Sequence, residues 1–152
     1  MQTRRETLKQ SALLAGMLAS TGLFPLGAQA AMSRSAFDAK TPADVYKAMG
    51  LSAPVASASI TITAPDIAEN GAVVPVGAAT TLPGVKQLLF LVEKNPTSLI
   101  AAFTLSDSVE ATISTRTKMA QSCDVYAVAV MNDGSLLYAK KEVKVTLGGC
   151  GG

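Results

Sequence analysis

Between residues 55 and 147 the chain consists of short segments in which apolar and polar residues alternate, separated by turn signals. Alternation at period two puts successive side chains on opposite faces of a strand, so it predicts β-strands with one buried face. Residues 88–92, Leu-Leu-Phe-Leu-Val, are continuously apolar and predict a strand buried on both faces. Asn70-Gly71 and Asp133-Gly134 predict tight turns. Such a chain can bury its apolar faces by stacking one sheet on another.

The expected strands are short and bounded by turn-forming residues, at 60–63, 73–76, 85–93, 99–105, 109–113, 125–131 and 135–147. Leu99, Phe103 and Leu105 are expected on one face of their strand. Pro75 cannot donate a ladder hydrogen bond, so strand 73–76 is expected at the edge of a sheet. About seven strands in roughly ninety residues predict an all-β fold, an immunoglobulin-like antiparallel β-sandwich.

One short helix is expected before the strands, beginning in the segment Thr41-Pro42-Ala43-Asp44. Threonine is a favoured N-cap, proline suits the first helical position, and an acid in the first turn complements the helix dipole. Gly50 is expected to end the helix. Its apolar side would be formed by Val45, Ala48 and Met49.

Residues 1–30 have the pattern of an export signal. Arg4-Arg5 gives a basic start, and Ala28-Gln29-Ala30 matches a signal-peptidase site, which predicts a mature chain beginning at Ala31. The segment Thr3–Lys9 resembles a twin-arginine (Tat) signal, which predicts export to the periplasm. The apolar run 12–26 is too short and too rich in glycine and proline for a membrane anchor. The mature sandwich domain is then expected over residues 31–147.

Composition excludes several classes of function. The chain has no histidine, so it has no Ser-His-Asp triad, no Cys-His pair and no histidine-based metal site. Without residues 1–30 it carries ten basic and ten acidic residues, and this zero net charge gives no electrostatic case for binding nucleic acid. No metal or cofactor motif is visible. Because the Tat route carries folded cargo, we expect a partner that is exported together with this chain.

The last five residues, Gly148-Gly149-Cys150-Gly151-Gly152, are expected to form a flexible arm that follows the final strand. Three residues separate Leu147 from Cys150, so the thiol would reach roughly 10 Å from the sandwich. Four glycines leave the arm thin enough to enter a narrow channel. Nothing nearby in sequence activates the thiol, because no base is present and the terminal carboxylate favours the protonated form. Cys150 is therefore interpreted as a covalent attachment site on which other enzymes act, and the chain as a carrier rather than an enzyme.

The second cysteine, Cys123, is expected to be a buried structural thiol, because it has the same parity as Val125 and Ala127 in a predicted strand. Two other interpretations remain open for the arm. Cys150 could pair with Cys123 in a disulfide, or the tail could be a frayed end without function.

Two segments together resemble SoxY, the covalent sulfur carrier of the periplasmic Sox thiosulfate-oxidation system. They are Asn70-Gly71-Ala72-Val73-Val74-Pro75-Val76 and Glu142-Val143-Lys144-Val145-Thr146-Leu147, the latter running into the glycine–cysteine pentapeptide. The resemblance implies an immunoglobulin-like sandwich that forms a heterodimer with a SoxZ subunit. It also implies that a c-type cytochrome, SoxXA, joins thiosulfate oxidatively to Cys150. The manganese-dependent SoxB would then release sulfate, and a sulfur dehydrogenase would oxidise the remaining sulfur where one is present.

Two other functions compete with the carrier interpretation. The Gly151-Gly152 end is similar to that of ubiquitin-like thiocarboxylate carriers, although export to a compartment without ATP and a strand-rich pattern argue against this class. A purely structural immunoglobulin-like subunit is the other alternative, and such a subunit would not need a thiol in its tail.

Overall fold

The structure, a computed structural model, describes residues 34–106 and 108–147. The predicted signal peptide (1–30) and the predicted arm (148–152) lie outside these residues. The described helices are α2 (Arg34–Asp38) and α3 (Pro42–Ala48). The strands are β1 (Val55–Ala56), β2 (Ile60–Thr63), β3 (Ile67–Ala68), β4 (Val74–Thr80), β5 (Val85–Val92), β6 (Leu99–Thr104), β7 (Thr112–Thr117), β8 (Cys123–Met131) and β9 (Leu136–Val145).

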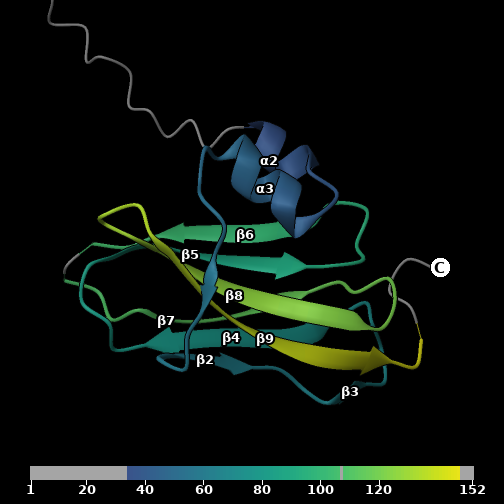
Figure 1. The fold of residues 1–152 in the computed structure, drawn as a ribbon. Coiled ribbons are helices and arrows are strands. Elements are labelled where there is room, and N and C mark those ends of the chain that lie inside the picture. The colour runs from purple at the N-terminus through teal and green to yellow at the C-terminus, as the bar shows by residue number, and fades with distance from the viewer. Residues whose placement is uncertain (1–33, 107, 148–152) are drawn as a thin grey trace, which may run out of the picture. The chain divides into compact units, whose positions relative to one another are not determined.

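The strands form two sheets that lie one over the other (Figure 1). The larger sheet has the order β1-β9-β8-β5-β6, with β3 also paired to β9, and the smaller sheet has the order β2-β4-β7. Most pairs are antiparallel, but the two-residue strands β1 and β3 both run parallel to β9. The predicted immunoglobulin-like β-sandwich is confirmed, and the helices cover the outer face of the larger sheet.

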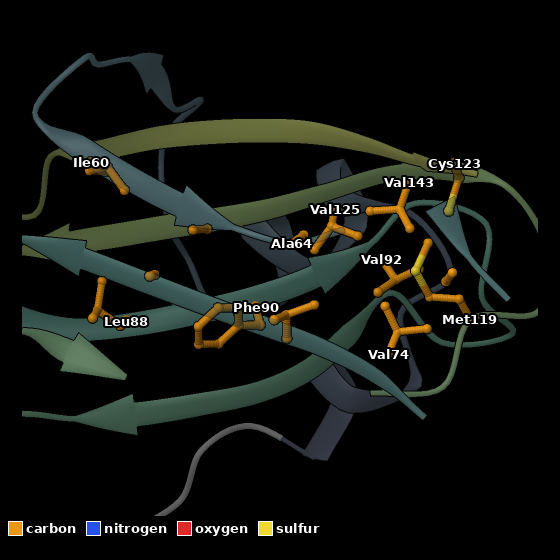
Figure 2. Close-up of a cluster of buried hydrophobic side chains, with 14 of the residues drawn as sticks. Ile60, Ala64, Val74, Leu88, Phe90, Val92, Met119, Cys123, Val125 and Val143 are labelled. Atoms are coloured by element: carbon orange, nitrogen blue, oxygen red, sulfur yellow. The ribbon is translucent and has the colours of Figure 1, made fainter. Parts of the chain in front are cut away.

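The first core fills the space between the two sheets (Figure 2). Phe90 of β5 lies at its centre and meets Phe103 of β6 edge to face, with ring centroids 6.1 Å apart. The other buried members come from both sheets and include Ile60, Val74, Val76, Leu88, Val92, Val125, Ala127, Ala129 and Val143. In β2 the inward-facing residues alternate with exposed threonines, the pattern that predicts a strand with one buried face, whereas in β5 and β8 the residues between them, such as Leu89 and Val128, are buried on the other side of the sheet.

A second core lies between the helices and the larger sheet. Leu89 and Leu91 of β5 point to this side, opposite to Leu88, Phe90 and Val92. The helices contribute Ala36, Val45 and Tyr46, and the sheet adds Leu99, Val128, Val130 and Leu136. The run 88–92 is thus buried on both faces, as its sequence predicts.

The predicted helix and hairpin signals are confirmed. Thr41 Oγ1 accepts a hydrogen bond from the Asp44 N–H at 3.2 Å, which makes Thr41 the N-cap of α3. Gly50 follows this helix with φ of 67°, a left-handed conformation that glycine adopts without strain. Gly134, at φ 83°, turns the chain from β8 into β9, and Asp133 Oδ1 accepts from the Ser135 N–H at 2.9 Å.

The edge position predicted from Pro75 is wrong, because β4 is the middle strand of its sheet. The physical reason is that β2 pairs with only part of β4, from Gly77 to Thr80. Pro75 lies beyond the end of β2 and pairs with Arg116 of β7 alone. Its missing N–H therefore costs the sheet no ladder hydrogen bond on the β2 side.

The common face predicted for Leu99, Phe103 and Leu105 is also wrong. The register between β5 and β6 shifts at Phe90/Leu91, so that Leu91 pairs with Leu99 while Phe90 pairs with Ala101. The extra residue, Ile100, reverses the parity of the strand. Leu99 consequently faces the helices, whereas Phe103 and Leu105 face the other sheet.

Several predicted bounds also differ. β4 runs from Val74 to Thr80 rather than over 73–76, and β9 ends at Val145 rather than Leu147. β7 begins at Thr112, so Val109 precedes it and is exposed. α2, β1 and β3 were not expected, because segments of two to five residues show too little periodicity to be recognised.

We expect Phe90→Ala to lower the free energy of unfolding by about 3–5 kcal/mol, because it removes a fully buried ring from the first core. Urea unfolding followed by circular dichroism measures the change. Val109→Ala, at an exposed position, is the matched control and should stay within about 0.5 kcal/mol of the parent. A loss below about 1 kcal/mol for Phe90→Ala would contradict the assignment of this core.

Candidate functional site at the base of the cysteine arm

The predicted attachment site, Cys150, and the glycines at 148, 149, 151 and 152 lie outside the described residues. What the structure describes is the base from which this segment leaves the sandwich. β9 ends at Val145, and Leu147 is three residues before Cys150. Residues 145–147 therefore define the point at which the segment that carries Cys150 is attached to the sandwich.

The segment 66–71 holds one side of this base through backbone hydrogen bonds. In the short parallel pair of β3 and β9, the Lys144 N–H donates to the Asp66 carbonyl at 3.0 Å and the Thr146 N–H to the Ala68 carbonyl at 3.1 Å. The Thr146 hydroxyl donates to the Glu69 carbonyl at 2.9 Å. Finally, the Gly71 N–H donates to the Leu147 carbonyl at 2.7 Å. The chain is thus hydrogen-bonded through Leu147, two residues beyond the end of its strand.

Ser122 holds the other side of the base. Its Oγ accepts a hydrogen bond from the Val145 N–H at 2.8 Å and donates to the Val145 carbonyl at 3.4 Å. β8 begins at Cys123, which pairs with Val143, so Ser122 lies one residue before the regular ladder. Its side chain replaces the backbone partner that the ladder would otherwise supply to Val145.

A second contact links the base to the β7–β8 connection. The Met119 N–H donates to the Gly71 carbonyl at 2.7 Å, and the same glycine donates to Leu147. Met119 is fully buried and lies in the first core near Val92 and Cys123 (Figure 2). Gly71 therefore connects the arm base directly to the hydrophobic core.

Cys123 lies at this same end of the core, at the start of β8 (Figure 2). It is a free thiol with 5% of its surface exposed, so the predicted burial is confirmed. Burial raises the pKa of the Cys123 thiol, and this effect outweighs the opposing hydrogen bond from the Lys94 backbone. A buried, protonated thiol is a poor nucleophile.

Two of the lysines that precede the arm, Lys140 and Lys141, have side-chain partners elsewhere in the sandwich. Lys140 Nζ lies 2.6 Å from Asp124 Oδ2, and the hydrogen bond to this carboxylate raises the pKa of Lys140. Lys141 Nζ donates to the Ala64 carbonyl at 2.6 Å and lies 3.0 Å from Asp66 Oδ1. Neither lysine is therefore arranged as a base for a thiol beyond Leu147.

The described residues offer little else that chemistry could use. Over 34–106 and 108–147, no group of three or more His, Cys, Asp and Glu side chains is placed to hold a metal ion. Neither of the two helices described there is long and apolar enough to cross a membrane.

A groove of about 520 Å³ is lined by residues such as Thr80, Val85 and Leu105, where β4 and β6 end and β5 begins. That is the end of the sandwich opposite to the arm base.

Sequence reasoning predicts an arm at residues 148–152, which the structure does not test, and it missed the residues that fix the base of this segment. Ser122 and Val145 are 23 residues apart, and Thr146 and Glu69 are 77 apart. A serine before a strand and a glycine in a turn are common, so no local signal distinguishes Ser122 or Gly71. Asn70-Gly71 predicts a turn and begins one of the two segments that resemble SoxY, but neither signal places it beside Leu147.

The fold and this base define a β-sandwich protein whose last strand carries a cysteine on a glycine-rich segment. The family model of the sulfur oxidation protein SoxY matches residues 45–150, a range that includes Cys150. The chain belongs to the SoxY family, and its role is that of a sulfur carrier in sulfur oxidation, working with partner proteins.

Solved structures agree with this assignment. The sulfur carrier protein SoxY from Chlorobium limicola f. thiosulfatophilum is 37% identical, with 63% of this chain and 87% of that chain covered and a TM-score of 0.57. A superoxide reductase (neelaredoxin) variant from Ignicoccus hospitalis is 18% identical, over 57% of this chain and 79% of that chain, with a TM-score of 0.51. At that identity the likeness shows the fold alone. The comparison with curated proteins gives no match.

We expect Ser122→Ala to loosen the arm base, because the Val145 N–H loses its hydrogen-bond partner. The loss should be about 1–2 kcal/mol in unfolding free energy, and amide hydrogen exchange should accelerate at Val145. The control is Ser114→Ala, an exposed serine of β7, which should change neither quantity. An unchanged rate of amide hydrogen exchange at Val145 in Ser122→Ala would contradict the role of Ser122 in holding Val145.

We expect Cys123 to be inert in the folded protein. In a Cys150→Ser variant at pH 8, Ellman's reagent should detect no thiol until urea is added, because burial blocks access and the raised pKa keeps the thiol protonated. The parent chain serves as the control, and reaction of its Cys150 with the reagent should rapidly release one equivalent of 2-nitro-5-thiobenzoate. Rapid reaction of folded Cys150→Ser would show that Cys123 is accessible.

Proposed function

We propose that this chain carries sulfur intermediates covalently on Cys150, within a flexible arm formed by Gly148, Gly149, Gly151 and Gly152, and presents them to the enzymes of a periplasmic Sox system. The proposal is carried by one observation: the SoxY family model includes Cys150, and the described chain is hydrogen-bonded up to Leu147, three residues earlier. An anchored base with a glycine-rich segment beyond it suits a group that must be handed from one active site to another.

The loading step would be an oxidative coupling with thiosulfate. The S–H bond of Cys150 breaks and a sulfur–sulfur bond forms to the outer sulfur of thiosulfate. The proton passes to water, and two electrons pass to a SoxXA-type cytochrome, one for each ferric haem reduced. The carrier supplies the thiol, and the cytochrome supplies the oxidant.

Release would be a hydrolysis by a SoxB-type enzyme that holds manganese in its own active site. Water attacks the terminal sulfone group, the bond between the two sulfur atoms from thiosulfate breaks, and sulfate leaves. The second sulfur stays on Cys150 as a persulfide, on which a sulfur dehydrogenase would act where one is present. In this scheme the carrier contributes no catalytic residue and no metal or cofactor of its own.

We also propose that the chain is exported by its Tat-type signal and forms a heterodimer with a SoxZ-like subunit. The pattern of residues 1–30 supports export, and family membership supports work with partner proteins. A partner without its own signal would travel with the folded chain. The alternatives, a structural subunit or a thiocarboxylate carrier, predict different chemistry at the end of the chain.

The test is intact-mass measurement of the mature protein, purified from the periplasm, after exposure to thiosulfate and the SoxXA-type cytochrome. We expect a mature chain beginning at Ala31, a co-purified small subunit, and sulfur adducts that disappear on reduction with dithiothreitol. Cys150→Ser should carry no adduct, because the attachment atom is missing.

The matched control is Cys123→Ser, which should be loaded like the parent because Cys123 is buried. Adducts that persist in Cys150→Ser, or that lie on the Gly152 carboxylate, would overturn the carrier assignment in favour of the thiocarboxylate class. A complete absence of adducts on the parent would favour the structural subunit.

A further inference from the structure

Exposed apolar side chains gather at the end of the sandwich from which the arm leaves. Five large apolar side chains are exposed in the described residues, and three of them, Ile67, Val73 and Leu147, lie at this end. They are 58%, 57% and 70% exposed. The other two, Val55 and Val109, lie beside the start of β9 and before the start of β7, toward the opposite end.

Hydrogen bonds bring the first three residues into one neighbourhood. Ile67 precedes the residue whose carbonyl accepts from the Thr146 N–H at 3.1 Å. Val73 is two residues after Gly71, whose N–H donates to the Leu147 carbonyl at 2.7 Å. These three side chains therefore belong to segments that touch one another at the arm base, and we call them the apolar patch. Figure 1 shows β3, which contains Ile67, beside the end of β9.

The short reach of the thiol determines what must approach this patch. Three residues extend roughly 10 Å when fully stretched, so the sulfur of Cys150 cannot travel far from Leu147. An enzyme that takes this sulfur into an active-site channel must bring the mouth of the channel against the residues around Leu147. Glycines offer no side chains for recognition, so the side-chain contacts that this chain itself contributes to docking must come from the sandwich.

We infer that Ile67, Val73 and Leu147 form the docking surface for the enzymes that act on Cys150, and that the surface around the channel mouth of these enzymes is apolar. This inference rests on the proposed carrier function. Asp66 and Glu69 are exposed and lie within two residues of Ile67, and exposed Lys144 pairs with Ile67 in the β3–β9 register, so both signs of charge adjoin the patch, as in the polar rim of an interface. A patch of three side chains suits a transient contact, because a carrier must release each enzyme before it meets the next.

Other occupants of the patch fit less well. A membrane surface would be expected to select basic or tryptophan-rich residues, whereas the chain has no tryptophan and its residues 31–152 carry no net charge. A second copy of this chain would need a much larger apolar area for a stable dimer. Both occupants nevertheless give distinct results in the test below.

The test compares patch variants with matched variants of equally exposed valines. Ile67→Ser, Val73→Ser, Leu147→Ser and the triple variant are made in the full mature chain with its small subunit bound. Val55→Ser and Val109→Ser are the controls. The rate of thiosulfate loading onto Cys150 by the SoxXA-type cytochrome gives kcat/KM, and alkylation by iodoacetamide gives the intrinsic reactivity of the thiol.

We expect each single patch variant to lower kcat/KM about twofold to fivefold and the triple variant to lower it at least about tenfold, mainly through KM. The controls should stay within about twofold of the parent. The alkylation rate should be unchanged in every variant, because the arm and its thiol are intact.

Equal loading of patch and control variants would overturn the inference while leaving the carrier function intact, since Cys150 would still be loaded. A parallel fall in the alkylation rate would also overturn it, because the patch would then act on thiol reactivity. Sedimentation would show a different role if the triple variant lost the small subunit, or ran as a monomer where the parent runs as a homodimer. The patch would then be a permanent subunit interface instead. Binding of the parent, but not of the triple variant, to phosphatidylglycerol vesicles would assign it to a membrane. Failure of the parent itself to load would count against the carrier function.

Discussion

The burial of β5 on both faces is the constraint on which the rest of this structure depends. Leu88, Phe90 and Val92 enter the core between the sheets, while Leu89 and Leu91 enter the core under the helices. A strand with no solvent-facing side forces the larger sheet to be covered twice, which requires both a second sheet and a helical layer. The side chains of the central strands are thereby used for packing. Residues available for binding or chemistry lie at the ends of the sandwich, where loops and chain termini emerge.

The hydrogen bonds that hold the chain up to Leu147 fix the starting point of the segment that follows. If β9 frayed before its end, the thiol would range over a wider volume and meet any partner in many orientations. The hydrogen bonds of residues 145–147 with Ser122, Ala68 and Gly71 instead fix the point from which the chain leaves the sandwich. Under the proposed function, the length of the glycine-rich segment, rather than local unfolding of β9, then limits how far the sulfur of Cys150 reaches from the sandwich.

Much of this fold could be predicted from the sequence, because its signals are local. The run 88–92, the Thr41 cap and the Asp133-Gly134 turn each act within a few residues, and all three are confirmed. The failures are non-local. The bulge at Ile100 depends on how β6 meets β5, and the position of Pro75 depends on where β2 ends. The hydrogen bonds at the arm base join residues up to 78 positions apart, such as Thr146 and Ala68, a distance over which one sequence carries no pairing information.

The two cysteines show how a single chain separates structure from chemistry. A carrier with two accessible thiols could be trapped as an internal disulfide, or could be loaded at a position that no enzyme reaches. Here one thiol is kept from reacting, because Cys123 is buried, pairs in register with Val143, and has a pKa that this burial raises. The first core thus does more than stabilise the sandwich. Under the proposed function, keeping one sulfur protonated and enclosed leaves Cys150 as the thiol that a partner enzyme can select by position alone.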